Sequence, residues 1–303
     1  MAIRTEILNI VRRIYDLNDL DLFSSGLNGQ TFKYGEDKLI KISSWNERAY
    51  GKLEKSVIID KLRHVNMIKL KDVKTPMIYN TPGNDLAMVF EYDNGTYMER
   101  YISYLIEKLE VIENEDNFNY EWGKLLGEIH TLGQNNIDKL PTYENDYLRI
   151  LNMCSDEEIK EIFQHLGQEI NVLPKTSINY GILHGDPQPN NFIQTKDELY
   201  AIDFDNMFKG FYVHDIAIGL EFAFENIKDI KNILEIDERI KIYEEFIKGY
   251  VTTKTGSEKY SEIDLFLRYR RAMRFIGLYK LLEKDSNNFD LAKQKILKNE
   301  KIL

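Results

Sequence analysis

Three polar side chains follow two short apolar runs in residues 180–211. The run GILHGD ends at Asp186, and Asn191 stands five residues further on, where a tight loop could return its carbonyl beside that carboxylate. The run LYAIDFD brings Asp203 to the end of a second predicted strand. Carboxylate and amide oxygens are hard ligands, so the set suits Mg and disfavours soft metals.

Phosphoryl transfer needs these groups, because it requires oxygen ligands for a metal, a base that orients the attacking hydroxyl and a cation on the phosphates. A single Asp in a loop is more often a capping residue than a catalytic one. Two carboxylates and an amide at two adjacent strand ends favour the catalytic interpretation. Elsewhere, His130 in LLGEIHTL is interpreted as a satisfied core histidine.

The segments before this region predict a small antiparallel sheet with helices around it. The first 20 residues form an amphipathic helix, and DLFSSGLNGQTFKYGEDKLIKI alternates apolar runs with turn residues. A helix is expected over residues 46–64, and strands over 76–79 and in LAMVFEY. The turn signal Asp93-Asn94-Gly95 is interpreted as the junction between two lobes.

Helices dominate the remainder of the chain. Apolar residues recur at three and four from Met98 to about Leu132 and over residues 155–173, which predicts helices that open the second lobe. Residues 215–303 are also expected to be mostly helical. We therefore expect a sheet lobe over residues 1–95 and a helical lobe over residues 96–303.

The motifs HGDPQPNNF and YAIDFDNMFKGFYVHDIA make a more specific prediction. They resemble the catalytic and metal-binding loops of the aminoglycoside phosphotransferase and choline kinase superfamily, which pairs H-G-D-x-x-x-x-N with I-D-F/W and a later D-I/L-A. The resemblance implies that Asp186 is the catalytic base or hydroxyl-orienting group and that Asn191 and Asp203 bind Mg. It also implies that Asp215 braces the loop and that His184 shapes it.

The same resemblance suggests where the nucleotide phosphates bind. In the family a strand lysine clamps the phosphates and pairs with a helix glutamate, which points to Lys41 in LIKIS and to Glu54. Glu54 begins the helix EKSVIIDKL, whereas the competing Glu47 lies nearer a turn. The loop SSGLNG, with Ser25 and Asn28, lacks the G-x-G-x-x-G pattern, so its role with the phosphates is inferred from position alone.

Residues 90–93, with Glu91 and Tyr92, are expected to form the hinge whose backbone groups hold the adenine. The resemblance implies an α+β protein-kinase-like fold that uses ATP, with GTP as an alternative, together with Mg. In protein kinases the arginine of H-R-D and the glycine of D-F-G are standard, and this chain has Gly185 and Asp205 there. A regulated protein kinase is therefore disfavoured.

The expected substrate is a hydroxyl of a small molecule, either aminoglycoside-like, choline-like or a related alcohol. Asp205, Glu221 and Glu225 are candidates for facing this acceptor, with solvated helix acids as the equal alternative. Residues 96–303 hold 26 basic against 37 acidic residues, which favours a cationic acceptor. The helix LRYRRAMRFIGLYKLL carries four arginines, commonly a solvated stripe; if they line the acceptor site, the acceptor is anionic.

Composition excludes several other classes. The formal charge of −10 argues against a nucleic-acid partner. No run approaches the roughly 18 apolar residues of a membrane helix, and the single Cys154 favours a reducing compartment, so we expect a cytoplasmic protein. The second hypothesis is a pseudokinase that binds nucleotide without turnover. The sequence leaves the oligomeric state and the identity of the acceptor open.

Overall fold

In a computed structural model the chain folds into two compact units. It describes residues 3–25, 29–44, 53–96, 98–112, 117–133, 137, 139–196, 198–224, 234–254, 260–282, 286–298 and 301–303. The sheet unit comprises Met1–Ile112, Ile137–Lys139 and Gln194–Ile202. The helical unit comprises Glu113–Asn136, Leu140–Ile193 and Asp203–Leu303. In the sheet unit, residues 194–202 are held by hydrogen bonds such as that from Ala201 N to Lys74 O.

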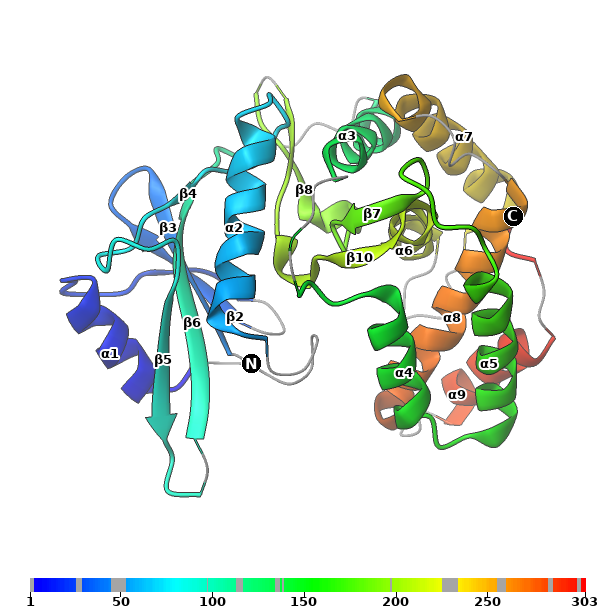
Figure 1. The fold of residues 1–303 in the computed structure, drawn as a ribbon, viewed down its shortest axis with the longest axis horizontal. Coiled ribbons are helices and arrows are strands. Elements are labelled where there is room, and N and C mark those ends of the chain that lie inside the picture. Colours follow the sequence, from blue (N-terminus) through cyan, green and yellow to red (C-terminus); the bar gives the residue numbers. More distant parts are fainter. Residues whose placement is uncertain are drawn as a thin grey trace. The chain divides into compact units, whose positions relative to one another are not determined.

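An antiparallel sheet organises the first unit, as the sequence predicts (Figure 1). Its strand order is β1-β2-β3-β6-β4, and β5 also pairs with β6. The strands are β1 (Leu22–Ser25), β2 (Gly29–Tyr34), β3 (Lys38–Ser44), β4 (Ile78–Tyr79), β5 (Met88–Asp93) and β6 (Met98–Glu107). The helices of this unit are α1 (Thr5–Ile14) and α2 (Lys55–Lys69).

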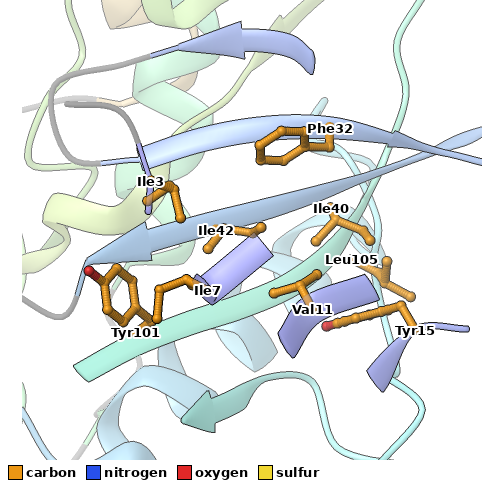
Figure 2. Close-up of a cluster of buried hydrophobic side chains, with 9 residues drawn as sticks. All are labelled: Ile3, Ile7, Val11, Tyr15, Phe32, Ile40, Ile42, Tyr101 and Leu105. Atoms are coloured by element: carbon orange, nitrogen blue, oxygen red, sulfur yellow. The ribbon is translucent and has the colours of Figure 1, made fainter. Parts of the chain in front are cut away.

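Helix α1 packs on one face of this sheet and forms a hydrophobic core with it. Its apolar residues recur at three and four, which gives the helix a single buried face. Figure 2 shows that these side chains meet others from β2, β3 and β6. The cluster consists of Ile3, Ile7, Val11, Tyr15, Phe32, Ile40, Ile42, Tyr101 and Leu105. Because Ile40 and Ile42 point into this core, the residue between them on β3 faces the other side of the sheet.

The prediction of a helix from Met98 is wrong, because residues 98–107 form β6. This strand pairs with β5 from the register pair Asp93–Met98 onward, so Asp93-Asn94-Gly95 is the turn of a β-hairpin. Gly95 has the left-handed φ of +84° that such a turn uses, and its N–H donates to Asp93 Oδ1 at 2.8 Å. The turn is therefore not a junction between lobes, and the sheet unit continues through Ile112.

The second unit is mainly helical (Figure 1). Its helices are α3 (Phe118–Leu132), α4 (Tyr143–Met153), α5 (Glu157–Asn171), α6 (Tyr212–Phe224), α7 (Ile236–Thr253), α8 (Tyr260–Leu282) and α9 (Ser286–Leu297). Among these, β7 (Tyr180–Leu183) pairs antiparallel with β10 (Phe208–Phe211). A further two-stranded sheet joins β8 (Phe192–Gln194) and β9 (Leu199–Ala201), of which β9 belongs to the sheet unit. No helix in the described parts of the chain combines the length and hydrophobicity needed to cross a membrane.

Two glycines bring α3 and α7 unusually close together. A Cβ on Gly123 would lie 1.9 Å from Phe246 O, and one on Gly249 would lie 1.9 Å from Tyr120 O. Only glycine leaves room for two backbones to approach to this distance. The two closely packed helices carry His130 of α3 and Tyr250 of α7, whose side chains support the loop before Asp186.

Candidate active site

The segment HGD leaves β7 through a turn that requires glycine. Gly185 has φ +86°, a backbone region that L-residues rarely adopt. A Cβ at this position would also lie only 2.0 Å from Asn206 O, in the loop that carries Asp203. The tight approach of these two loops explains why glycine stands where protein kinases have arginine.

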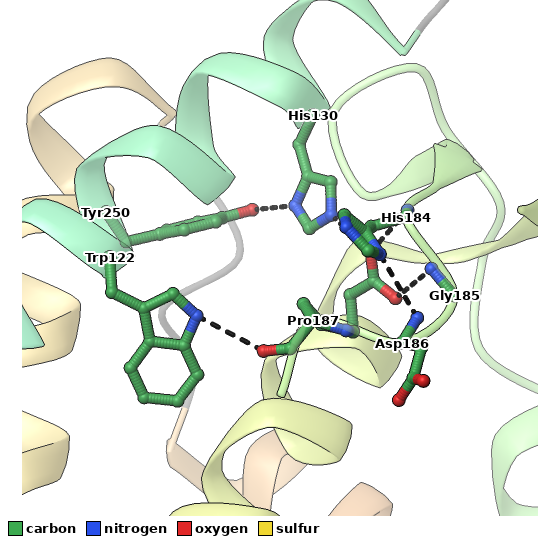
Figure 3. A network of polar contacts seen from close by, with 8 residues as sticks. Trp122, His130, His184, Gly185, Asp186, Pro187 and Tyr250 are labelled. Atoms are coloured by element: carbon green, nitrogen blue, oxygen red, sulfur yellow. Dashed lines mark hydrogen bonds and ion pairs between the residues drawn. The ribbon is translucent and has the colours of Figure 1, made fainter. Parts of the chain in front are cut away.

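The carboxylate of Asp215 holds this turn, whose residues His184, Gly185 and Asp186 are labelled in Figure 3, in place. From the fourth residue of α6, its Oδ2 accepts the N–H of His184 at 2.7 Å and its Oδ1 accepts that of Gly185 at 2.9 Å. Asp215 is fully buried, so these bonds lie in a medium of low dielectric and are strong. The bracing role that the resemblance implied for Asp215 agrees with this geometry.

His130 supports Asp215 from α3 and is itself supported by α7. Its Nε2 lies 3.0 Å from Asp215 Oδ2, and its Nδ1 lies 2.8 Å from the hydroxyl of Tyr250. Because a carboxylate only accepts, Nε2 carries the proton and Nδ1 accepts from Tyr250 O–H. Burial lowers the pKa of His130, which favours this neutral form. The interpretation of His130 as a satisfied core histidine is confirmed.

Trp122 and Tyr250 belong to the same support, and the sequence did not single them out. Trp122 Nε1 donates to Pro187 O, directly after Asp186, at 3.2 Å. Tyr250 lies 120 residues from its partner His130 in the sequence, so no local pattern connects the two. The sequence does carry a local signal for His130. It follows Leu126 by four residues, which places both on the buried face of α3.

Asp186 projects from the braced loop and is half-buried. Burial raises the pKa of its carboxyl, the nearby Asp203 raises it further, and the charges of His184 and Arg270 lower it. Gln188 Nε2 donates to Asp186 Oδ2 at 3.3 Å, and Asp186 N–H donates to His184 Nδ1 at 3.3 Å. The structure thus fixes the backbone of this acid firmly and supplies charges of both signs around its carboxylate.

Asn191 and Asp203 lie near Asp186 in the same unit. Asn191 is buried, and its Nδ2 donates to Asp186 O at 2.8 Å; the predicted ligand atom, its side-chain carbonyl oxygen, takes no part in this bond. Asp203 lies two residues beyond β9 in the left-handed region, with φ +63°, which Asp tolerates better than most residues. The predicted return of the loop to Asp186 is present, and so is the predicted position of Asp203 at a strand end.

These residues fit a Mg ion. The carboxylates of Asp186 and Asp203 repel each other, and a divalent cation would relieve that repulsion. The set holds two carboxylates and one amide; a metal cluster of three or more His, Cys, Asp or Glu side chains is not present among the described residues. One or two carboxylates and an amide, completed by substrate phosphates and water, is the usual protein share of a Mg site.

Lys41 lies in β3, between Thr31 of β2 and Tyr104 of β6. It points away from the face that α1 covers, because its neighbours Ile40 and Ile42 occupy that face. Its Nζ lies 5.9 Å from the centre of the Tyr104 ring. Lys41 therefore lies on the face of the sheet opposite α1, and its role with the nucleotide phosphates stays a prediction.

Glu54, predicted to pair with Lys41, has a different partner in the structure. It directly precedes α2, and its Oε2 accepts from Lys139 Nζ at 2.9 Å. This is an exposed pair, with 62% of the Glu54 side chain accessible. The competing candidate, Glu47, lies outside the described residues.

The other residues predicted to bind the nucleotide are Glu91, Tyr92, Ser25 and Asn28. Glu91 and Tyr92 lie within the β5–β6 hairpin, so the prediction that they form a hinge between lobes is wrong. The turn signal after them closes a hairpin, and the chain first leaves the sheet unit after Ile112. Ser25 ends β1, where its Oγ accepts from Gln30 Nε2 at 3.1 Å. Asn28 lies outside the described residues.

Of the acceptor candidates, Asp205 is half-buried in the 3₁₀ turn after Asp203, and Glu225 lies outside the described residues. Glu221 is buried and paired with both Arg270 and Arg274. It is therefore not the solvated helix acid of the alternative interpretation, and its position facing the acceptor stays a prediction.

Comparison with known proteins agrees with this arrangement. Residues 59–262 match the phosphotransferase enzyme family. Amicoumacin kinase of Bacillus subtilis (strain 168) is 28% identical over 148 residues, which are 46% of this chain and 44% of that protein. The chain thus matches less than half the length of this curated relative.

Solved structures share the fold over nearly the whole chain. The amicoumacin kinase hAmiN in complex with AMP-PNP, Ca²⁺ and Ami superposes with a TM-score of 0.82 at 15% identity, covering 99% of this chain and 95% of that one. A microcompartment-associated aminopropanol kinase gives 0.72 at 16% identity, covering 98% of each chain. The predicted α+β fold with an antiparallel sheet and a mainly helical remainder is confirmed. With its family match and its braced HGD loop, the chain belongs to the phosphotransferase enzyme family.

Proposed function

We propose that this protein transfers the γ-phosphoryl group of ATP to a hydroxyl of a small molecule in the presence of Mg. The observation that carries the proposal is the grouping of Asp186, Asn191 and Asp203 on loops that a buried carboxylate braces. GTP is the alternative donor. Family membership supports the reaction class, and the named substrates of the relatives, amicoumacin and aminopropanol, are small molecules.

In this proposal Asp186 accepts a hydrogen bond from the acceptor hydroxyl and takes its proton as the hydroxyl oxygen bonds to the γ-phosphorus, while the bond from that phosphorus to the bridging oxygen breaks and ADP leaves. The loop contributes by position, because a braced carboxylate needs no reorganisation when the acceptor arrives. Asn191 and Asp203 would hold the metal through their oxygens. Bound to these residues, Mg would neutralise charge on the phosphates, and Lys41 is the further cation that we propose for them.

The second candidate is a module that binds nucleotide without turnover. The three-residue set argues against it, since an idle domain needs neither the base nor both ligands. The two functions are separated by measuring ADP release from Mg-ATP with a panel of amino alcohols, amino sugars and hydroxy acids, together with calorimetry of nucleotide binding. Nucleotide binding with no ADP release above the acceptor-free rate, for every compound of the panel, would favour the idle module.

A substitution at Asp203 tests the metal assignment directly. Asp203→Asn replaces one of the few protein charges on the metal with a neutral amide, so it should weaken ATP binding in the presence of Mg. Without Mg, wild type and variant should bind ATP alike. Calorimetry with and without Mg makes the comparison, and an unchanged Mg effect in the variant would remove Asp203 from this role.

A further inference from the structure

Among the described residues, Lys254 is a buried lysine whose ammonium pairs with no carboxylate. It directly follows α7, and its backbone N–H donates to Tyr250 O at 2.9 Å. The residue is 6% exposed, and burial lowers the pKa of its ammonium. Its Nζ lies over the ring of Tyr212, 4.5 Å from the ring centre. The charge is therefore held by an aromatic face in a cation–π contact.

Tyr212 connects this charge to the support of the catalytic loop. It is the first residue of α6 and is fully buried. Its ring stacks on that of His130, with 4.6 Å between the ring centres and 28° between the ring planes. Its hydroxyl lies against β7, because a Cβ on Gly181 would be only 2.2 Å from it. A displacement of the Tyr212 ring is thus transmitted to the imidazole of His130.

His130 in turn holds Asp215, the carboxylate that braces the catalytic loop. Helix α7 reaches this imidazole in two ways, from residues that lie one helical turn apart. The hydroxyl of Tyr250 bonds to its Nδ1 (Figure 3), and the ammonium of Lys254 acts on it through the ring of Tyr212. Both routes end on the histidine that supports the brace.

A glycine on α3 makes room for this arrangement. A Cβ on Gly127 would lie 2.7 Å from Tyr250 O and 3.5 Å from the Cβ of Lys254. Gly127 precedes His130 by three residues, so the close approach of the two helices lies beside the histidine. The packing of α3 on α7 therefore brings Lys254 to the loop support and withdraws it from the surface.

Packing alone does not explain the charge of Lys254. An ammonium loses hydration when it is buried, and a cation–π contact returns only part of that loss. A methionine would fill a similar space without this cost.

The charge of Lys254 also acts directly on His130. Burial lowers the pKa of this imidazole, and Asp215 raises it. The charges of Lys254 and His184 lower it further. Lys254 thus favours the neutral imidazole, whose Nε2 donates to Asp215 while its Nδ1 accepts from Tyr250.

We propose that Lys254 is a positioning residue for phosphoryl transfer, which acts through Tyr212 and His130 on the backbone of the catalytic loop. This inference rests on the proposed function of the protein. The ammonium attracts the face of Tyr212 and keeps that ring stacked on His130, which then holds Asp215 where both of its oxygens accept from the loop. Its effect on the catalytic carboxylate is indirect, so loss of the charge should lower turnover without changing ATP binding.

The first test removes the charge of Lys254 and keeps much of the shape. Lys254→Met should lower kcat about 10-fold, because small displacements of catalytic groups are expensive, and should leave the KM for ATP within about twofold. Its melting temperature should equal or exceed that of wild type, since no charge is buried. Lys254→Arg keeps a cation over the ring and should restore kcat to within about threefold of wild type. Turnover is measured as ADP release from Mg-ATP with the panel of amino alcohols, amino sugars and hydroxy acids.

The second test needs no acceptor. The backbone N–H groups of His184 and Gly185 donate to Asp215, so their hydrogen exchange reports on the brace itself. In Lys254→Met both amides should exchange about 10-fold faster at an unchanged melting temperature. Lys248→Met is the matched control, because Lys248 is exposed on the same helix, and it should change neither turnover nor exchange.

A double variant tests the route through Tyr212. Tyr212→Leu removes the aromatic face and should lower kcat by itself. If Lys254 acts through that ring, adding Lys254→Met to Tyr212→Leu should change kcat by less than about twofold, because coupled residues are not additive. A further 10-fold loss in the double variant would contradict this route.

Turnover and amide exchange in Lys254→Met equal to those of wild type would overturn the proposal. So would a loss of turnover that Lys254→Arg does not restore, or one that comes with a lower melting temperature, since Lys254 would then be a packing residue. The proposed function fails separately, if no compound of the panel gives ADP release with the wild-type protein. Faster exchange of the two loop amides in Lys254→Met would even then show that Lys254 holds the loop.

Discussion

The catalytic loop and the predicted nucleotide residues of the sheet unit are held by different kinds of interaction. At the loop, Asp215 and His130 are fully buried and joined by hydrogen bonds. In the sheet unit, Glu54 makes an exposed pair with Lys139, and the pair between Glu91 and Arg100 leaves 47% of each side chain accessible. The loop is thus braced by a buried network, whereas the predicted nucleotide residues have surface pairs.

This difference indicates which part of the chain holds its side chains in position before a ligand binds. A buried network in low dielectric preorganises the loop before substrate arrives. Surface ion pairs contribute little to stability, and the backbone of Lys41 is fixed by the ladders that β3 makes with β2 and β6. Substitutions should therefore have large effects at the loop and small effects at the surface pairs.

The largest effect is expected for Asp186→Asn. The amide cannot take the proton of the acceptor hydroxyl, so turnover should fall by about 100-fold or more, the usual range for a positioned acid or base. The backbone network around the loop does not involve this side chain's charge, and the melting temperature should not fall. Single-turnover ADP release and calorimetric ATP binding make the measurement. Turnover near that of wild type would remove Asp186 from its role.

Asp215→Asn should displace the same loop, because it weakens the hydrogen bonds that hold the backbone of His184 and Gly185. The amide offers one acceptor oxygen where the carboxylate satisfies three donors, so a buried network is broken at a cost of about 3 kcal/mol in unfolding free energy. Turnover of the folded protein should fall about 10- to 100-fold, because small displacements of catalytic groups are expensive.

A second buried acid of the helical unit provides the control for Asp215. Asp264 binds Arg268 and the N–H of Ile302, away from the loop. Asp264→Asn should lower stability as well but leave turnover of the folded protein unchanged. If both variants lose turnover alike, the effect of Asp215 is one of general stability and the contrast drawn above fails.

The sequence predicted the return of Asn191 to Asp186 correctly because the relation of these two residues is local. Asp186 and Asn191 lie five residues apart, and a tight loop between two short strands leaves few ways to arrange them. The partners that hold this loop could not be predicted in the same way. Tyr250 meets His130 from 120 residues away, and Arg270 meets Glu221 from 49 residues away, so only the packing of α3 on α7 and of α6 on α8 brings them together.

The error at β6 has a physical cause as well. The strand reads MERYISYLIE, and residues 101–105 are all buried because β6 lies inside the sheet between β3 and the strands β4 and β5. A strand buried on both faces loses the alternation of apolar and polar residues, and a short apolar run then fits a helix equally well. The misplaced hinge at Glu91 and Tyr92 followed from this error, since a helix from Met98 required the lobe to end at Gly95.

Acid should lower the free energy of unfolding through one buried histidine in each unit. Burial lowers the pKa of His214 on α6 to about 3 and that of His64 on α2 to about 4. Each folded pKa lies below the ordinary value of about 6.5, so the unfolded chain binds more protons, and stability is lost as pH falls below about 6.5. At pH 5 each histidine should cost about 2 kcal/mol relative to pH 7.

His214→Phe tests this in the helical unit. The ring packs among aromatic residues such as Tyr143, Phe208 and Tyr269, and among the described residues neither ring nitrogen has a hydrogen-bond partner, so phenylalanine fits the surroundings. Asp215 and Arg270 are the charges that act on His214. Denaturant unfolding at pH 7 and pH 5 should show a smaller difference in the variant. An equal loss in both proteins would mean that other groups cause the acid sensitivity.

The smallest effect is expected for Glu54→Gln. The carboxylate sits on the surface before α2 and pairs with Lys139, so its loss should change neither the melting temperature by more than about 1 °C nor the KM for ATP by more than about twofold. The matched variant Lys139→Gln breaks the same pair but keeps the carboxylate. If Glu54→Gln raises the KM for ATP about 10-fold while Lys139→Gln does not, the carboxylate serves Lys41 during the reaction, as the sequence predicted. A 10-fold rise in both would point to the surface pair itself. No rise in either would show that ATP binding does not depend on the Glu54 carboxylate, which is the contrast with the braced loop.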